Sequence, residues 1–170
     1  MEELKSLKIE QTSKNYFNLK NNRKNVKFKL YKLLCPFGID NEYGNLIVKL
    51  ELEQSNSKHL ELINQVKDFE NKLKEQFHSN DEEWKSLISV RENNNIFIEA
   101  KVKIIKNKLL TTLTFEDNDS NYLKTMYELG KNFYCDVILE IPTLWDFRKD
   151  NEENVNKIGL ILNLFSIHVY

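Results

Sequence analysis

Residues 26–34 read VKFKLYKLL, a segment in which apolar residues alternate with lysines and a tyrosine. Successive side chains of a β-strand point to opposite faces, so one face of this segment is apolar and the other carries Lys27, Lys29 and Tyr31. The next residues, 35–38, read CPFG, and proline and glycine stop ladder pairing there. We therefore predict a strand with one buried face and one outer face that mixes lysine with an aromatic ring.

The same alternation returns in other short segments, which clusters of Asn and Asp separate. The clearest is residues 96–105, IFIEAKVKII, which places Phe97, Lys101 and Lys103 opposite an apolar face. Asn107 and Lys108 then read as a hairpin turn. The final strand is apolar at almost every residue, so we expect it to be covered on both faces. The other predicted strands are 46–53, 109–115, 135–141 and 159–170.

One long segment has the helical period instead. Apolar residues between 58 and 78 recur at steps of three and four, with charged residues between them. Ser57 is the predicted N-cap, and a second short helix is predicted at 121–129. Several strands with one long inserted helix favour a mainly β protein, an OB-fold-like Greek-key barrel. We expect a single domain over residues 1–170, with 1–25 as an N-terminal extension.

The composition is that of a globular protein, with 41% hydrophobic and 30% charged residues. The apolar runs are too short to cross a bilayer. Asn, Lys and Ile make up 58 of the 170 residues, which we attribute to an AT-rich genome or genetic element. The two cysteines, Cys35 and Cys135, form neither a disulfide framework nor a zinc motif, so we expect a reducing, cytoplasmic location.

The net charge of −1 is unevenly distributed. Residues 1–34 hold nine basic and three acidic residues, and residues 101–108 add four lysines without an acid. Residues 51–83 and 115–155 are acidic, with nine and ten carboxylates against four basic residues each. A basic region beside acidic flanks is compatible with a polyanionic partner, and equally with a solvated surface on which charges cluster by chance.

No arrangement of residues indicates catalysis. The three histidines, His59, His78 and His168, share no spacing, and Cys35 has no recognisable base beside it. The acidic run at 81–83 follows the predicted helix and reads as a solvated turn. Four scattered glycines cannot build a phosphate-binding loop. We therefore predict a protein that is not an enzyme and that needs no metal or cofactor.

The two strands with mixed outer faces point to a binding function. Exposing Tyr31 and Phe97 among lysines forgoes apolar burial, which is explained if a partner covers the rings. Single-stranded nucleic acid suits this surface, because unpaired bases stack on aromatic rings while lysines neutralise phosphates. The interpretation assumes that the two strands are neighbours and form one groove. The alternative is that both rings lie beneath the inserted helix or a loop.

The order of features resembles the single-stranded DNA-binding proteins of large nucleocytoplasmic DNA viruses, which are similar in fold to those of short-tailed phages. The resemblance is carried by residues 34–39 (LCPFGI), Trp84, residues 137–141 (VILEI), Trp145 and the closing strand from Gly159. It implies an OB-fold core, the coating of exposed strands during DNA replication, and no cofactor. The AT-rich composition also fits a cytoplasmic linear plasmid of yeast.

We therefore predict sequence-tolerant binding of single-stranded DNA by a homo-oligomer that works with replication proteins and not at a membrane. The alternative is a protein-interaction or assembly module of a viral or plasmid complex. Tyr31, Phe97 and Trp84 are predicted to stack on bases. The residues predicted to neutralise phosphates are Arg23, Lys24, Lys27, Lys29, Lys32, Arg91, Lys101, Lys103, Lys106 and Lys108.

Overall fold

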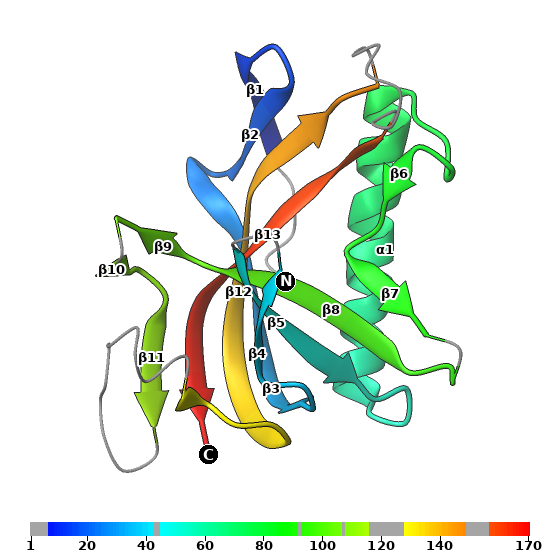
Figure 1. Cartoon of the computed structure of the whole chain (residues 1–170). Helices are drawn as coiled ribbons and strands as arrows, with labels where there is room; N and C mark the ends of the chain where they lie inside the picture. Colours follow the sequence, from blue (N-terminus) through cyan, green and yellow to red (C-terminus); the bar gives the residue numbers. More distant parts are fainter. Residues whose placement is uncertain (1–6, 43–44, 92, 107, 116–127, 149–156) are drawn as a thin grey trace.

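The computed structural model describes residues 7–42, 45–91, 93–106, 108–115, 128–148 and 157–170 (Figure 1). Strands dominate these residues, and one long helix, α1 (Ser57–Phe77), stands beside them. The strands are β1 (Leu7–Ser13), β2 (Tyr16–Asn21), β3 (Lys24–Cys35), β4 (Ile39–Glu42), β5 (Asn45–Leu52), β6 (Trp84–Lys85), β7 (Ile88–Val90), β8 (Ile96–Val102), β9 (Ile104–Ile105), β10 (Lys108–Leu109), β11 (Thr112–Phe115), β12 (Phe133–Asp146) and β13 (Ile158–Val169).

Five of these strands close into a barrel. β3 pairs with β5, β5 with β8, β8 with β13, β13 with β12, and β12 returns to β3. The ring is only partly closed, because β3 and β5 share a single paired position, Leu34 with Glu51, and β8 and β13 share two. A five-stranded, partly open barrel with one parallel pair is the OB-fold arrangement, so the predicted fold class is confirmed.

The alternation predicted for the barrel strands is present in the structure. Along β3, Val26, Phe28 and Leu30 are buried, whereas Lys27 and Lys29 between them are exposed. The inward residues of β5 and β8 are buried in the same core. β13 is covered on most of its length but not throughout, because Phe165 is exposed. The turn was predicted at residues 107–108, but Lys108 already belongs to β10 and pairs with Ile105 of β9, while residue 107 lies outside the described residues.

The inserted helix lies where the sequence predicts it, between β5 and β6. Leu62, Val66, Phe69 and Leu73 pack into the barrel core, as their spacing requires. The helix is capped one residue earlier than expected: Asn56 Oδ1 accepts a hydrogen bond from the Lys58 backbone N–H at 3.0 Å. The prediction of Ser57 as N-cap is therefore wrong. The helix predicted at 121–129 falls almost wholly outside the described residues.

Residues 7–21, predicted only as part of an N-terminal extension, form a hairpin. β1 pairs with β2, and β2 pairs in turn with β12 and with the start of β3. Leu19 is fully buried in the barrel core. The segment therefore continues the sheet beside β12, and it projects above the barrel in Figure 1. Among the described residues, no helix has the length and hydropathy to cross a membrane.

Candidate nucleic-acid interface

A groove of about 480 Å³ runs along the outer side of the barrel, between strands β5, β7 and β8 and the ends of β12 and β13. Its floor is the outward face of β8, where Glu99 and Lys101 emerge. Ile47 of β5 lies opposite Lys101 in the ladder, and Ser89 of β7 lines the groove on the other side of β8. We call this feature the barrel groove.

Positive charge enters the groove from two elements. Lys101 comes from β8, and Lys85 comes from β6, which pairs with the start of β13. Both ammonium groups lack a carboxylate partner within the described part of the chain. The one acid on the floor, Glu99, lies 4.0 Å from the Lys49 ammonium, which offsets its charge. An anionic ligand in the groove therefore meets uncompensated lysines.

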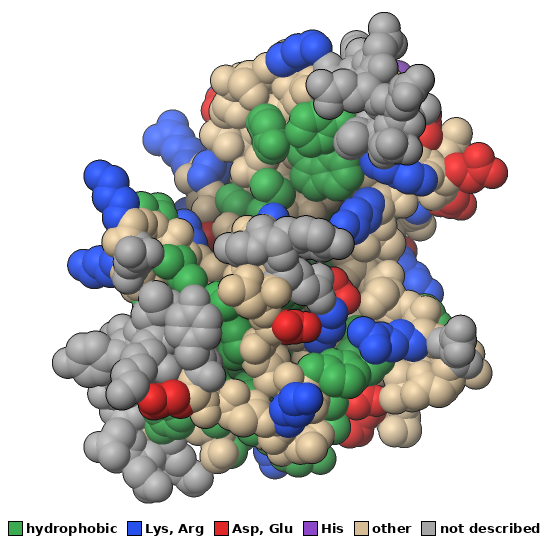
Figure 2. All heavy atoms as spheres, in the orientation of Figure 1, with side chains coloured by type: hydrophobic (Ala, Val, Ile, Leu, Met, Phe, Trp, Pro, Cys, Tyr) green, Lys and Arg blue, Asp and Glu red, His purple; other side chains and the backbone are tan. Residues whose placement is uncertain are grey.

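An aromatic cluster borders the barrel groove at its upper end, and Trp145 is its member that lines the groove. The Trp145 ring lines the groove and lies 5.6 Å from the Phe147 ring, which meets the exposed Tyr16 ring edge-on at 5.7 Å. Hydrophobic side chains gather over this part of the molecule in Figure 2, with lysine or arginine side chains around them. These rings offer apolar faces beside the cations, which is the combination that unpaired bases and phosphates require.

Gly159 leaves room for the Trp145 ring and the Lys85 side chain beside it. It pairs with Trp145 in the β12–β13 ladder and with Lys85 in the β6–β13 ladder. A Cβ atom at Gly159 would lie 2.8 Å from Trp145 Cζ2 and 3.1 Å from Lys85 Cβ. The absence of a side chain therefore lets the indole and the lysine stem approach each other over the backbone.

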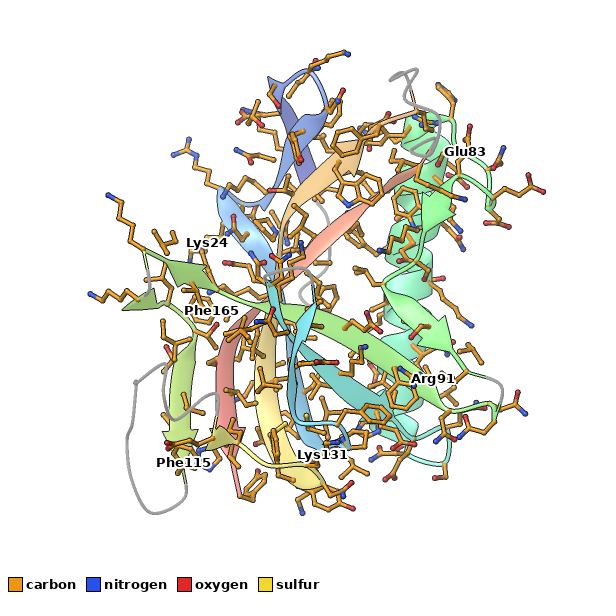
Figure 3. The ribbon with its side chains drawn as sticks, viewed as in Figure 1. Lys24, Glu83, Arg91, Phe115, Lys131 and Phe165 are labelled. Atoms are coloured by element: carbon orange, nitrogen blue, oxygen red, sulfur yellow. The ribbon has the colours of Figure 1, made fainter. Side chains whose placement is uncertain are left out.

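A second aromatic group lies at the lower end of the same face. The Arg91 guanidinium is 5.0 Å from the centroid of the Phe37 ring and 5.1 Å from that of Phe97, and the two rings are 5.8 Å apart. Phe37 remains 40% exposed. Arg91, one of the predicted phosphate contacts, is exposed beside it, at the lower right in Figure 3.

Two predicted base contacts are not accessible. Phe97 is only 3% exposed, because Phe37 from the loop after β3 and Arg91 lie over its ring. Trp84 is 6% exposed and belongs to the hydrophobic core. The prediction that Phe97 is exposed is wrong, since a period of two assigns side chains to faces but does not reveal what covers the second face. The predicted stacking of Trp84 on a base is not possible for a ring buried in this way.

The predicted residues of β3 lie outside the barrel groove. Lys27, Lys29, Tyr31 and Lys32 are all exposed, as predicted. However, β3 and β8 do not pair, because β5 lies between them. Lys29 and Tyr31 line a separate hollow of about 250 Å³ that shares no residue with the groove. The prediction that the two strands form one groove is therefore wrong.

The remaining predicted cations surround these features. Arg23 and Lys24 are exposed at the turn between β2 and β3. Lys103 is exposed just after β8, and Lys106 and Lys108 are exposed at the β9–β10 turn. None of the five lines the barrel groove. Figure 3 shows Lys24 and Arg91 on opposite sides of the molecule, so one short ligand cannot contact both.

Several residues in the groove or beside it were not predicted as contacts. Trp145 and Phe37 appear in the motifs that carry the family resemblance, so a signal for them was present. Tyr16 and Phe147 follow segments without strong periodicity, and they meet only because β2 pairs with β12. Lys85 carries no signal in the sequence, because its place depends on the parallel pairing of β6 with β13.

The two cysteines and His59 are buried and make structural contacts. Burial raises the pKa of the Cys35 thiol to about 11 and that of the Cys135 thiol to about 12, so both are protonated at neutral pH. The buried His59 ring accepts a hydrogen bond from the Glu53 backbone N–H at 3.1 Å. Within the described residues, no group of three or more His, Cys, Asp or Glu side chains could hold a metal ion.

Comparison with known proteins gives structural matches alone. No protein-family model and no curated protein sequence matches the chain. The single-stranded DNA-binding protein of bacteriophage Enc34, truncated at its C-terminus, superposes with a TM-score of 0.56 at 12% identity over 96% of this chain and 92% of that one. The same phage protein in complex with single-stranded DNA gives 0.55 at 12% identity, over 98% and 96% of the two chains.

A third match is gp2.5, a single-stranded DNA-binding protein encoded by bacteriophage T7. It superposes with a TM-score of 0.55 at 9% identity, over 85% of this chain and 86% of that one. At such low identity the likeness concerns the fold. The three matches cover between 85% and 98% of this chain.

Proposed function

We propose that the chain binds single-stranded DNA without sequence preference and that the barrel groove is the principal contact. In chain order the barrel strands are β3, β5, β8, β12 and β13, so β5 and β8 are the second and third. OB-folds bind oligonucleotides on the face of these two strands, between the loops that flank it. The groove lies on this face, which is the observation that carries the proposal.

The side chains of the groove have the chemistry that this function needs. Lys85 and Lys101 are placed to neutralise phosphates, with Arg91 farther along the same face. Trp145 offers a ring in the groove, and the half-exposed Phe37 offers one beside Arg91 on the same face. Stacking on rings and charge neutralisation do not read base edges, so binding by these contacts tolerates any sequence.

Binding of this kind supports a role in coating. A protein that covers unpaired DNA by its backbone and base faces protects the strand while it is exposed, as during replication. We propose that several copies line the same strand and that replication proteins act on the covered DNA. Protection of a single strand from nuclease digestion, increasing with protein concentration up to saturation, tests this role.

The direct test is a titration of labelled oligo(dT) with the double variant Lys85→Ala/Lys101→Ala. Each phosphate contact contributes roughly 0.7 to the log–log slope of affinity against salt, so we expect the slope to fall by about 1.4. The matched control is Lys67→Ala/Lys72→Ala, which removes the same charge from exposed positions on α1. We expect the control to bind like the unmodified protein.

Two outcomes of the oligo(dT) titration contradict the proposal. If oligo(dT) does not bind at low salt, or if both double variants weaken it alike, the groove is not the contact. A salt-insensitive homo-oligomer that purifies without nucleic acid would instead favour the assembly module. A mobility-shift comparison of single-stranded DNA, double-stranded DNA and RNA defines the preferred nucleic acid.

A further inference from the structure

We infer that the bound strand leaves the barrel groove and continues over β13 and β12 to a second contact on β3, so that one DNA strand follows the barrel around its side. This inference rests on the proposed function and extends it. The second contact consists of Lys27, Lys29, Tyr31, Lys58 and Phe165, which we call the β3 tract. Phe165 and Arg91 lie on opposite sides of the barrel in Figure 3, so the two contacts are distinct.

A row of paired residues connects the two contacts. Lys101 on the groove floor pairs with Asn163 of β13, Asn163 pairs with Glu140 of β12, and Glu140 pairs with Lys27 of β3. Directly paired residues point to the same side of a sheet, so all four point away from the barrel core, although Glu140 is only 5% exposed. Three steps between strands span about 15 Å, a distance that a few nucleotides of an extended strand cover.

The β3 tract begins at a bulge that turns a ring outward. Ser166 pairs with Ile138 and Leu164 pairs with Leu139, which leaves Phe165 between them without a partner in the ladder. Phe165 is 41% exposed, and the Lys27 ammonium lies 3.2 Å from the centroid of its ring. Glu140 lies beneath, 3.9 Å from the same ammonium, and offsets part of its charge.

The tract continues to a tyrosine flanked by two further lysines. The Tyr31 ring is 46% exposed, with the Lys29 ammonium 4.9 Å and the Lys58 ammonium 6.0 Å from its centroid. The three residues line the 250 Å³ hollow between β3 and the start of α1. The acid of this hollow, Glu61, accepts a hydrogen bond from Gln65 at 2.9 Å.

The backbone beside Tyr31 departs from regular strand geometry. Tyr31 and Lys32 together face the single residue Asp136 of β12, which is a second bulge. Lys32 adopts a φ of 53°, a conformation that costs energy for a residue with a side chain, and its N–H donates to Asp136 Oδ1 at 2.9 Å. Bulges of this kind re-aim side chains beside functional sites.

The chemistry of the tract fits a nucleic-acid strand. Rings and ammonium groups follow one another as Phe165, Lys27, Lys29, Tyr31 and Lys58, and a DNA strand presents bases and phosphates in a similar alternation. The tract is continuous with the barrel groove through the row of paired residues. One strand can therefore occupy both contacts in sequence.

Oligonucleotide length separates the two contacts in an experiment. An oligo(dT) of about 6 nucleotides fits one contact, and one of about 20 nucleotides exceeds the largest footprint usual for one OB-fold. With the variant Lys29→Ala/Tyr31→Ala/Lys58→Ala we expect the affinity for the short oligonucleotide to change by less than about twofold, and that for the long one to fall at least tenfold. The long oligonucleotide also loses about 1.4 of its salt slope, since two phosphate contacts are removed.

Other outcomes identify which idea fails. If the triple variant binds both lengths as the unmodified protein does, the β3 tract does not touch DNA and the inference is overturned. If it weakens both lengths equally, the strand does not extend from one contact to the other, which overturns it as well. If instead Lys85→Ala/Lys101→Ala changes the affinity for neither oligonucleotide, the barrel groove is not a DNA contact and the proposed function fails. All three replaced side chains are exposed, so we expect the triple variant to fold. Circular dichroism checks this.

Discussion

At the residue scale, the two tryptophans give separate optical signals. Trp145 lines the barrel groove, whereas Trp84 is buried in the core. A base that stacks on Trp145 quenches its fluorescence, so we predict that oligo(dT) quenches the unmodified protein and the Trp84→Phe variant but not Trp145→Phe. Trp145→Ala is expected to cost about 1–3 kcal/mol of binding free energy, the usual value for one stacked base.

The Gly159→Ala variant provides the control for this signal. Its added methyl group would lie 2.8 Å from Trp145 Cζ2, so the indole has to rotate away from the backbone. We expect weaker quenching by oligo(dT) although every aromatic and basic side chain is retained. If Gly159→Ala and Trp145→Phe both leave quenching intact, then the groove wall does not contact the bases.

Phe37 and Phe97 touch each other but should behave differently when replaced. Phe37 is half-exposed at the lower end of the groove face, so Phe37→Ala is expected to weaken oligo(dT) binding by about 1–3 kcal/mol with little loss of stability. Phe97 is buried, so Phe97→Ala should lower the free energy of unfolding by about 3–5 kcal/mol. Urea denaturation and oligo(dT) titration of the two variants measure the contrast. Equal losses of stability would contradict it.

These two rings also show the limit of prediction at this scale. Alternation correctly placed Phe97 on the face opposite the core, together with Lys101. Its burial depends on Phe37, a residue of a loop about sixty positions away in the chain, and on Arg91. A local period carries no information about such a contact. Tyr31 has the same pattern and, among the residues that the structure describes, no aromatic ring packs over it, so its exposure was predicted correctly.

At the scale of the element, α1 positions one side of the barrel groove through a buried carboxylate. Glu70 accepts hydrogen bonds from the Leu87 backbone N–H at 2.6 Å and from the Ser86 hydroxyl at 2.8 Å. The segment that it holds carries Lys85 and Ser89 into the groove. Glu70 is therefore a positioning residue, since it lines no part of the groove itself.

We predict that Glu70→Ala lowers both stability and binding. The part-buried Leu87 N–H loses its partner, which costs about 1 kcal/mol of folding free energy, the low end of the range for a buried group, and the loosened segment weakens oligo(dT) binding. Glu70→Gln keeps an acceptor oxygen and should recover most of the affinity. Chemical denaturation and oligo(dT) titration at matched fractions folded measure the two effects. Full affinity in Glu70→Ala would show that α1 does not position the segment.

Elements with a strong period were predicted well and the others poorly. The helix at 58–78 was found because its apolar residues recur at helical spacing over five turns. The first hairpin was missed although β1 alternates at Leu7 and Ile9, since its side chains are only partly buried and the segment is short. β6 has two residues, too few for any periodic signal, and its position depends wholly on β13.

At the scale of the whole molecule, the fold class followed from the sequence but the neighbours of each strand did not. Several alternating strands and one helix suffice to favour a barrel. The ladder order, in which β5 separates β3 from β8, depends on contacts between distant residues. The predicted cations were therefore correct in their exposure and wrong in their grouping, because they lie on two different sides of one barrel.

The chain has a net charge of −1, so the attraction for a polyanion has to be local. Salt dependence reports the cations that contact phosphates, because each contact releases condensed counterions, and it does not report the net charge. Asp68 and Glu75 are exposed on α1 and line neither hollow.

We therefore predict that Asp68→Asn/Glu75→Gln, which raises the net charge by two, leaves the salt slope of oligo(dT) binding unchanged. At 0.1 M salt the affinity should rise by less than about threefold, since salt screens exposed charges that do not contact the DNA. Lys101→Ala changes the net charge by one and should still reduce the slope by about 0.7. A slope that followed net charge in both variants would mean that the protein attracts DNA by its overall field, and no particular groove would then be needed.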